Sequence, residues 1–297
     1  MPNLDGHLGK STIRPSGIYS YPDTITVWLR RDLTNSERAF FDANCAGHFD
    51  LRRNGEWVRV NRKLVHIWHP DPAYCRRLQL YQPNTAALER LAALDDVRLT
   101  GVDVALDWVF DSEEERDAAY EALCLRHVKL NHSGHHVAFV GDGGTTRYSN
   151  QRHAPNNLAA YSDKICRVTG EVYCLHNEWR IKGNRALCRA GIRSPRDLLG
   201  IDFQAFWIKR LLLRDVDVVR LGRAHQNWAN GTKRKRHSRS RPSGFHYDKD
   251  RRTGGLLKRA YGSTQNLIDA FGCRFDLRRC LVPIDVAHLL PVQDIPL

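Results

Sequence analysis

The spacing of apolar and polar positions predicts strands and helices in mixed order along the chain. Residues 24–30 (Thr-Ile-Thr-Val-Trp-Leu-Arg) have the composition of a strand. Val97–Phe110 is predicted as one long strand, and its side chains alternate with period two between residues 101 and 108. Between these stretches, Trp57–Trp68 is expected to be extended, and the apolar spacing of Asn84–Leu94 predicts a short amphipathic helix.

Two helices are expected to begin at capping boxes, in which a Ser or Thr and a later Glu satisfy each other's backbone N–H groups. Thr34 and Glu37 form such a pair before the helical stretch Arg38–Asn44, and Ser112 and Glu115 open a second helix. Further helices are predicted later in the chain, at Asn184–Ala190, from Ser194 and Pro195 onward, and at Phe203–Leu213.

Several short extended runs follow the second capped helix, at His136–Val140, Thr145–Tyr148, Leu158–Lys164 and Val172–Lys182. The order of a long strand, a helix and then several strands differs from alternating strand–helix units, which build parallel sheets. The sequence therefore predicts an α+β fold whose central, mostly antiparallel sheet is flanked by helices. We divide the chain into an N-terminal α+β part (1–95), the sheet with its flanking helices (96–215) and a C-terminal segment (216–297).

The charge of the chain points to a phosphate-rich partner. Its 297 residues include 46 Lys and Arg against 33 Asp and Glu, which gives a formal charge of +13. The C-terminal segment is densely basic between Gly222 and Ala260, and such a run is expected to remain unpacked and partly flexible. We expect its centre to contact nucleic acid, through Lys233, Arg234, Lys235 and Arg236. A solvated linker on a protein with a basic surface is the alternative.

Cysteine spacing and apolar run lengths exclude other classes of protein. The eight cysteines include no closely spaced pair of the kind that holds zinc, so a zinc finger or ribbon is not expected. No run approaches the ~18 apolar residues that span a bilayer, and the N-terminus does not resemble a secretion signal. We therefore expect a cytoplasmic protein with reduced thiols and no membrane partner.

Two carboxylates share one face of the predicted central strand. Because side chains alternate along a strand, Asp103 and Asp107 project on the same side as the small residue Ala105. Asp is disfavoured in strands, so a pair of them suggests a hard divalent cation as ligand. Solvated acids on an exposed face are the alternative, and Asp103 in particular could support the sheet.

A later strand places two possible metal ligands beside two cations. His176, Glu178, Arg180 and Lys182 alternate with apolar residues and so share one face. The imidazole and carboxylate suit Mg²⁺ or Mn²⁺, and the cations suit phosphate oxygens. A salt bridge between Glu178 and Arg180 would explain the same pattern without any ligand.

A tyrosine between these strands is the candidate nucleophile. A phenol has a pKa near ~10, so it attacks phosphate only where a metal or cation stabilises the charge. Tyr161, with Lys164 close behind it, fits that requirement, and Tyr148 is a rival. The ordinary role of a tyrosine at a strand end is packing.

Taken in order, these motifs resemble the replication-initiation proteins of rolling-circle plasmids and filamentous phages, the trans-acting Rep family related to HUH endonucleases. The resemblance covers residues 97–215. It rests on Val-Asp-Val-Ala-Leu-Asp at 102–107, Tyr148 with Arg152, Tyr161-Ser-Asp-Lys164, His176-Asn-Glu-Trp-Arg180, and the junction Trp179–Leu187. The chain departs from the HUH pattern because it has no His-hydrophobic-His triplet.

The resemblance implies a metal-dependent, site-specific nicking and joining endonuclease that begins rolling-circle DNA replication. In this family a tyrosine attacks the scissile phosphate, stays joined to the 5′ phosphate and frees a 3′ hydroxyl that primes synthesis. Carried onto this chain, Tyr161 with Lys164 would be catalytic, and Asp103, Asp107 and Glu178 would surround Mg²⁺ or Mn²⁺.

The same resemblance implies origin DNA as the partner, either single-stranded or extruded as a hairpin. Arg152, Arg180 and Lys182 would contact this DNA, and the N-terminal part is left for origin recognition. A host helicase and a homodimer are further partners to consider. Two other hypotheses remain open: a non-catalytic DNA-binding regulator or packaging protein, and a nuclease that activates water at its metal.

Overall fold

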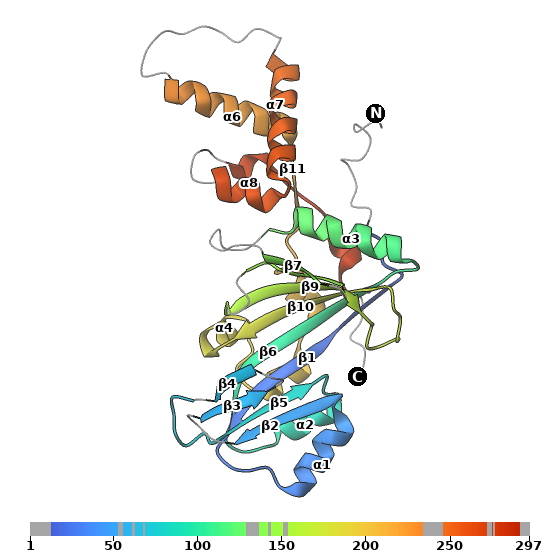
Figure 1. Ribbon diagram of the computed structural model, residues 1–297, viewed down its shortest axis with the longest axis vertical. Helices are drawn as coiled ribbons and strands as arrows, with labels where there is room; N and C mark the ends of the chain where they lie inside the picture. The colour runs from blue at the N-terminus through green and yellow to red at the C-terminus, as the bar shows by residue number, and fades with distance from the viewer. Residues whose placement is uncertain are drawn as a thin grey trace. The chain divides into compact units, whose positions relative to one another are not determined.

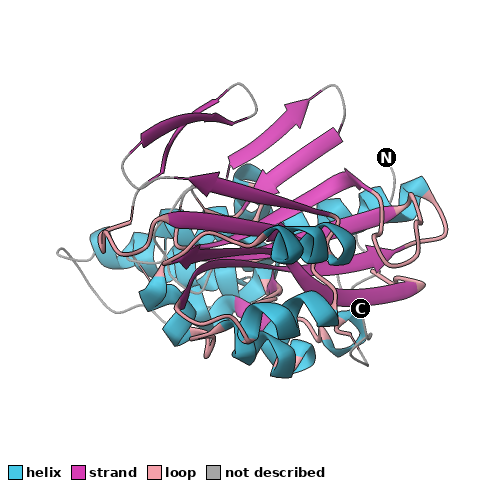
Figure 2. Ribbon diagram, turned by 90° about the horizontal axis from the view of Figure 1, so that it is seen from below, coloured by secondary structure: helices cyan, strands magenta, loops and turns pink. Residues whose placement is uncertain are grey.

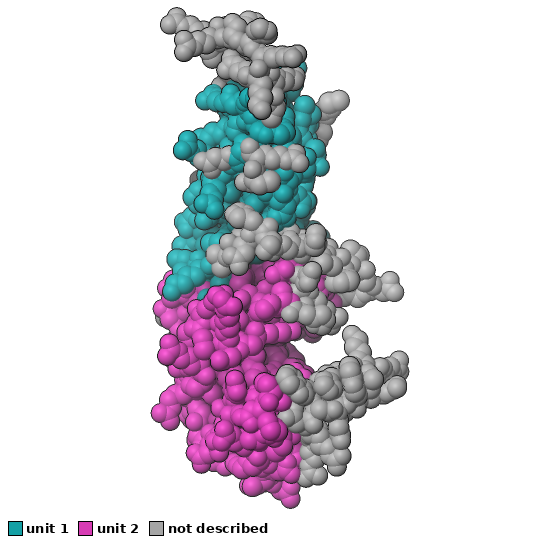
Figure 3. All heavy atoms as spheres, turned by 90° about the vertical axis from the view of Figure 1, so that its left-hand side faces the viewer, with its two compact units in different colours: residues 1–15, 110–134, 207–290 teal, residues 16–109, 135–206, 291–297 magenta. Residues whose placement is uncertain are grey.

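The computed structural model describes residues 13–52, 56–60, 63–67, 69–128, 137–141, 144–150, 154–233, 246–271, 275 and 277–291. The chain forms two compact units (Figure 3). The sheet unit contains residues 16–109 and 135–206, and the helical unit contains residues 110–134 and 207–290. These units cut across the three predicted segments, because strands from the first segment join the same sheet as strands from the second.

An eight-stranded sheet organises the sheet unit, and β6 and β10 lie in its middle (Figure 1). Every strand pairing within it is antiparallel, which confirms the predicted α+β class. The strand order across the sheet is β2 (Gly47–Arg52), β5 (Arg76–Tyr81), β1 (Gly17–Leu29), β6 (Val97–Val109), β10 (Cys174–Lys182), β9 (Asn156–Lys164), β8 (Gly144–Tyr148) and β7 (Val137–Gly141). A separate hairpin pairs β3 (Glu56–Val60) with β4 (Lys63–Ile67).

Short helices accompany the sheet (Figure 2), and two of them, α1 and η1, begin at the predicted signals of Thr34 and Ser194. Thr34 and Glu37 form the expected capping box. The helix predicted over Phe203–Leu213 ends early, at Ile208. The helix at Asn184–Arg189, α4, contacts both β6 and β10. The elements are α1 (Asn35–Asn44), α2 (Thr85–Ala92), α4 (Asn184–Arg189), the 3₁₀ helix η1 (Pro195–Gly200) and α5 (Phe203–Ile208).

The two faces of β6 differ as the alternation predicts. One face is apolar and fully buried: Val102, Val104, Leu106 and Trp108 are each at most 1% exposed. This face supplies the core of the sheet unit, since burying apolar surface is the main favourable term in folding. The opposite face therefore carries the polar residues of the strand.

The helical unit contains α3 (Glu113–Arg126), α6 (Val218–Lys233), α7 (His246–Tyr261) and α8 (Thr264–Phe271). Smaller elements complete it: β11 (Arg214–Val216) paired with β12 (Leu281–Pro283), and the 3₁₀ helices η2 (Leu277–Cys280) and η3 (Ala287–Leu289). The helix predicted from Ser112 is α3, whose first turn Ser112 caps.

The prediction of an unpacked basic segment between residues 222 and 260 is wrong at both ends. Helices α6 and α7 occupy those ends and pack against each other. They can do so because two glycines face the partner helix, where a Cβ on Gly222 or Gly254 would collide with its backbone. Lys233 ends α6, whereas Arg234, Lys235 and Arg236 lie outside the described residues.

Among the helices that the structure describes, none has both the length and the apolarity needed to cross a membrane.

Candidate active site

Strand register brings the predicted polar residues together on one face of the sheet. On β10, His176 lies opposite Asp107 of β6, and Arg180 lies opposite Asp103. On the other side of β10, His176 lies opposite Tyr161 of β9. Directly opposite residues in an antiparallel pair lie close enough for their side chains to touch. Three strands therefore supply acids, cations and a tyrosine to one place.

A bulge in β1 adds an acid that the strand pattern does not reveal. The register between β1 and β6 shifts between Pro22 and Thr24, which leaves Asp23 without a partner on β6. A bulge redirects the side chains beside it. Pro is tolerated at a bulge because the pairing of the strands is already interrupted there, so its missing N–H costs no hydrogen bond of the sheet. Gln82 holds this acid: its amide donates to Asp23 Oδ1 (2.9 Å), and its backbone N–H donates to the Asp23 carbonyl (2.6 Å). Gln82 adopts φ of +45°, a left-handed conformation that costs energy for a side chain of this size.

On this face, a fully buried carboxylate orients the histidine. Asp107 is 0% exposed, and its Oδ1 lies 2.6 Å from His176 Nδ1. Its other oxygen accepts a hydrogen bond from the Tyr21 hydroxyl at 2.9 Å. The opposite ring nitrogen of His176, Nε2, lies 3.1 Å from Glu178 Oε1. Asp107 thus fixes the ring so that Nε2 faces Glu178.

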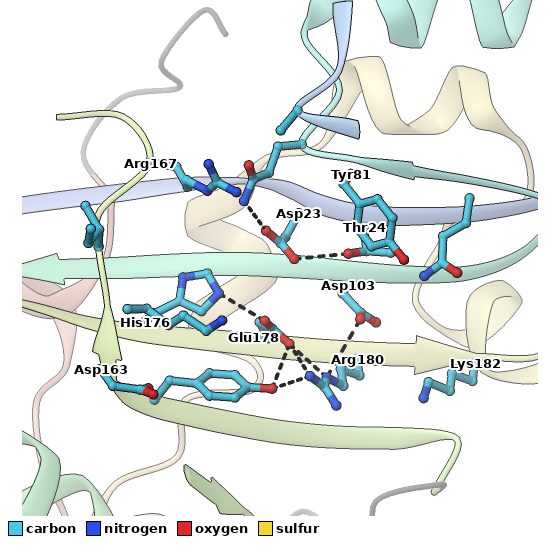
Figure 4. Close-up of a pocket in the computed structure, with 16 residues that line it drawn as sticks. Asp23, Thr24, Tyr81, Asp103, Asp163, Arg167, His176, Glu178, Arg180 and Lys182 are labelled. Carbon is cyan, nitrogen blue, oxygen red and sulfur yellow. Dashed lines mark hydrogen bonds and ion pairs between the residues drawn. The ribbon is translucent and has the colours of Figure 1, made fainter. Parts of the chain in front are cut away.

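Arg180 joins Glu178 to the candidate nucleophile. Its guanidinium donates to Glu178 Oε2 at 2.6 and 2.8 Å and also to the Tyr161 hydroxyl. The Tyr161 hydroxyl in turn lies 3.4 Å from Glu178 Oε2. Arg180 Nε is 3.7 Å from Asp103 Oδ2, so one cation spans two acids and a phenol. Figure 4 shows Glu178 between His176 and Arg180.

Burial and neighbouring charges shift the pKa values of the side chains in the site. Burial and the charge of Glu178 raise the pKa of Tyr161 above its usual value, and Arg180 opposes this rise. Burial and Glu178 also raise the pKa of Asp103 to about 7. Burial alone would favour neutral His176, but hydrogen bonds to Asp107 and Glu178 outweigh it and raise the pKa of His176 to about 10.

Glu178 behaves differently from the other acids. Burial would raise its pKa, but the hydrogen bond from His176 and the charge of Arg180 outweigh that effect and lower the pKa to about 2. Burial and Glu178 raise the pKa of Asp23. The site therefore holds one firmly ionised carboxylate among acids whose charge is disfavoured, an arrangement typical of functional sites.

These side chains line a cavity of about 1110 Å³ on the exposed face of the sheet. Lys164, whose ammonium lies 5.4 Å from the centre of the Tyr161 ring, is part of its wall. The lining residues are Asp23, Thr24, Ala46, Gln79, Tyr81, Gln82, Asp103, Tyr161, Asp163, Lys164, Ile165, Arg167, His176, Glu178, Arg180 and Lys182.

One group of donors in this cavity fits a divalent cation. Ligand atoms of Asp23, His176 and Glu178 all lie within 4.8 Å of one another. Carboxylates and imidazoles are both ligands of divalent cations in proteins. A histidine that binds metal usually donates its other nitrogen to a carboxylate, and Asp107 occupies that position at His176. The residues present therefore fit a divalent cation, without selecting which one.

Comparison with known proteins finds a likeness only among solved structures. No family model matches the chain, and no curated protein matches it. Among solved structures, the chain is similar to one titled "Structure of Rolling Circle Replication Initiator Protein from Geobacillus stearothermophilus", with 12% sequence identity and a TM-score of 0.40. The similarity covers 66% of this chain and 86% of that one.

The structure brings half of the predicted site residues into this cavity. Tyr161, Lys164, Asp103, Glu178 and the two cations of β10 all line it. Asp107 does not, because it is fully buried with both oxygens hydrogen-bonded. Arg152 lies outside the described residues. Tyr148 is next to the site, since the Arg180 guanidinium lies 5.3 Å from its ring centre.

Two residues of the metal group do not follow from the sequence pattern alone. His176 is a possible ligand by residue type, but alternation along one strand does not show that it pairs with Asp107. Asp23 lies just before the predicted strand at Thr24, and the Pro22-Asp23 pair was the only signal of a bulge there.

Buried thiols form a second group of donors. Sγ atoms of Cys166 and Cys174 and a carboxylate oxygen of Asp107 lie within 4.8 Å of one another. Both cysteines are 0% exposed. This group shares Asp107 with the site.

Proposed function

We propose that this protein nicks and rejoins one strand of DNA through a tyrosine-linked intermediate, and that this reaction initiates rolling-circle replication. The observation that carries the proposal is the contact of the Tyr161 hydroxyl with both Arg180 and Glu178, inside a cavity that also holds a metal-type donor group. A tyrosine used only for packing does not require a cation and a carboxylate at its hydroxyl.

Tyr161 supplies the oxygen that attacks the scissile phosphorus. A new Tyr–O–P bond forms to the 5′ phosphate, the P–O3′ bond breaks, and the leaving oxygen takes a proton to become a 3′ hydroxyl. Glu178 accepts a hydrogen bond from the phenol and so holds its oxygen in place. Because the pKa of Glu178 is lowered to about 2, this carboxylate is a weak base, and the phenol proton passes to solvent, which also protonates the leaving oxygen. Arg180 lies beside the same hydroxyl, where it stabilises the negative charge that develops on the phenol and phosphate oxygens.

Asp23, His176 and Glu178 would hold the cation, with Asp107 positioning His176. A bound divalent cation would polarise the phosphate and so compensate for a nucleophile whose pKa is raised by burial. Asp103 is not needed as a ligand in this arrangement. It pairs with Arg180 at 3.7 Å, which keeps the guanidinium near the tyrosine.

The charge of the chain supports a DNA substrate. A net charge of +13 favours binding to polyphosphate by displacing its counterions. Lys164 and Arg167 stand at the cavity wall beside Tyr161, where a phosphate backbone would pass. The same surface would serve the alternative hypothesis of DNA binding without cleavage, so the chemistry has to be tested directly.

The test is a cleavage assay with the purified full chain. Labelled single-stranded oligonucleotides that tile the DNA flanking its coding sequence are incubated with Mn²⁺ or with EDTA, and products are resolved on a denaturing gel. We expect a protein-linked band that requires Mn²⁺ and disappears in Tyr161→Phe but persists in Tyr148→Phe. Binding without cleavage of any oligonucleotide would favour the regulator, and cleavage that survives Tyr161→Phe without a linked band would favour a water-activating nuclease.

A further inference from the structure

A second cavity, of about 310 Å³, lies beside the first on the same face of the sheet. The two cavities share Thr24, Gln79, Asp103 and Lys182 in their walls. They are therefore one continuous surface that extends from the candidate active site across β10, β6, β1 and β5. Figure 4 shows Lys182 beyond Arg180, on the side away from His176.

The second cavity is lined mainly by hydroxyls and cations rather than by acids. Its walls are formed by Thr24, Thr26, Trp28, Arg77, Gln79, Thr100, Gly101, Asp103 and Lys182. Asp103 is its one carboxylate, and the Arg180 guanidinium lies 3.7 Å from that group. Threonine hydroxyls, a guanidinium and an ammonium together are the groups that contact phosphate oxygens.

Arg77 is the unusual residue of this surface. It is half-buried, and burial lowers the pKa of its guanidinium. Within the described part of the chain, no carboxylate forms an ion pair with it. Its neighbour Arg76, on the opposite face of β5, shows the normal arrangement, with Asp32 and Asp50 bound to its guanidinium. Burying a cation without an anion costs free energy, so Arg77 fits a site whose anion comes from a ligand.

We infer that Arg77 and Lys182 bind a phosphate of the DNA strand that passes through the active site, at a position flanking the scissile phosphate. This subsite rests on the proposed function, because it takes the same strand as its ligand. Lys182 is four residues along β10 from Glu178, or ~13 Å at the usual strand rise. The phosphate held there is therefore close along the strand to the one that Tyr161 attacks, but not adjacent to it.

The subsite gives the strand a register. One phosphate fixed at Arg77 and another at Arg180 would lay the backbone across the strands of the sheet. Phosphate contacts position a nucleic acid without reading its sequence. Arg77 is thus a positioning residue, and its loss should weaken binding of every single strand to a similar extent.

The experiment measures binding separately from cleavage. A fluorescent single-stranded DNA oligonucleotide is titrated with the full chain in EDTA, over a series of salt concentrations, and anisotropy gives Kd. For Arg77→Met and Lys182→Met we expect about tenfold weaker binding and a salt dependence shallower by about 0.7, as loss of one phosphate contact predicts. Arg77→Lys should recover part of the affinity, and Arg196→Met, which removes an exposed arginine outside both cavities, should bind as the wild type does.

Unchanged Kd and salt dependence in both Arg77→Met and Lys182→Met would overturn the subsite. Thermal unfolding checks that the variants fold, and Lys182, which is exposed, carries the test should Arg77→Met fail to do so. The two proposals fail differently. If the wild type nicks DNA but these variants bind normally, the subsite is wrong and the proposed function stands. If the variants bind weakly but the wild type never nicks, the subsite stands as a DNA-binding surface and the proposed function is wrong.

Discussion

The Nδ1 atom of His176 lies 2.6 Å from Oδ1 of Asp107, and both side chains are buried. This contact turns Nε2 of His176 toward Glu178 and Asp23. We therefore predict that Asp107→Asn lowers Mn²⁺ affinity by about 10- to 100-fold, the usual effect of losing a residue that orients a metal ligand. Isothermal titration calorimetry measures the affinity.

Tyr21→Phe is the matched control for that variant. It removes the other hydrogen bond to Asp107 (2.9 Å) but leaves the carboxylate and the His176 contact in place. We expect a smaller loss of Mn²⁺ affinity than in Asp107→Asn. Equal affinity of Asp107→Asn and wild type would show that Asp107 does not position His176 for metal.

Arg180 is expected to act in the reaction more than in binding. Its guanidinium fork reaches Glu178, Asp103 and the Tyr161 hydroxyl together, and a lysine ammonium cannot reproduce that geometry. We predict that Arg180→Lys slows single-turnover formation of the protein–DNA product by about 10²- to 10³-fold, as loss of a charge-stabilising donor does. The Kd for the strand should change far less. A loss confined to Kd would contradict this role.

The crossing of α6 and α7 depends on glycine. A Cβ on Gly254 would collide with the Val218 carbonyl, whereas Gly255, one residue along the same helix, has open space around it. We predict that Gly254→Ala destabilises the helical unit by about 1–3 kcal/mol or more, as overpacking does. Gly255→Ala should stabilise it by up to about 1 kcal/mol, through helix propensity alone. Urea unfolding followed by circular dichroism compares the two, and equal effects would contradict the close crossing.

Glu37 links the stability of the sheet unit to pH. Arg31, at 2.7 and 2.8 Å, and the Thr34 backbone N–H, at 2.8 Å, lower the pKa of Glu37 to about 2. Because this folded-state pKa is below the unfolded value of about 4.3, its stabilisation is complete above that pH and is lost as pH falls toward 2. We predict that Glu37→Gln lowers the free energy of unfolding by about 1–3 kcal/mol at pH 7.

The free energies of unfolding of wild type and Glu37→Gln should converge as the solution is acidified. Urea unfolding of wild type and Glu37→Gln is measured from neutral pH downward. A difference that stays constant at low pH would show that the ionised carboxylate does not provide this stability.

Much of the candidate site follows from alternation along single strands. The pattern of β6 and β10 places Asp103, Glu178 and Arg180 on polar faces, and the structure confirms those faces. Alternation does not give the register between strands, which decides that His176 faces Asp107. Alternation also fails at a bulge, and for this reason it does not place Asp23 in the site.

The helical unit shows a different limit of sequence reasoning. A high density of Lys and Arg predicted an unpacked segment, but α6 and α7 each need only a narrow apolar stripe, with Gly222 and Gly254 at their crossing. Composition averages over both faces of a helix, so it conceals such a stripe. Glycine, which is unfavourable in an isolated helix, there allows close contact between two backbones.

The central claim is that Tyr161 forms a covalent bond with DNA, and mapping that bond tests it most directly. The protein-linked product is purified, digested with nuclease and protease, and the modified peptide is identified by mass spectrometry. The account predicts a nucleotide phosphate on Tyr161, in the peptide that contains β9. A phosphate on Tyr148 or on another residue, with Tyr161 unmodified, would contradict it.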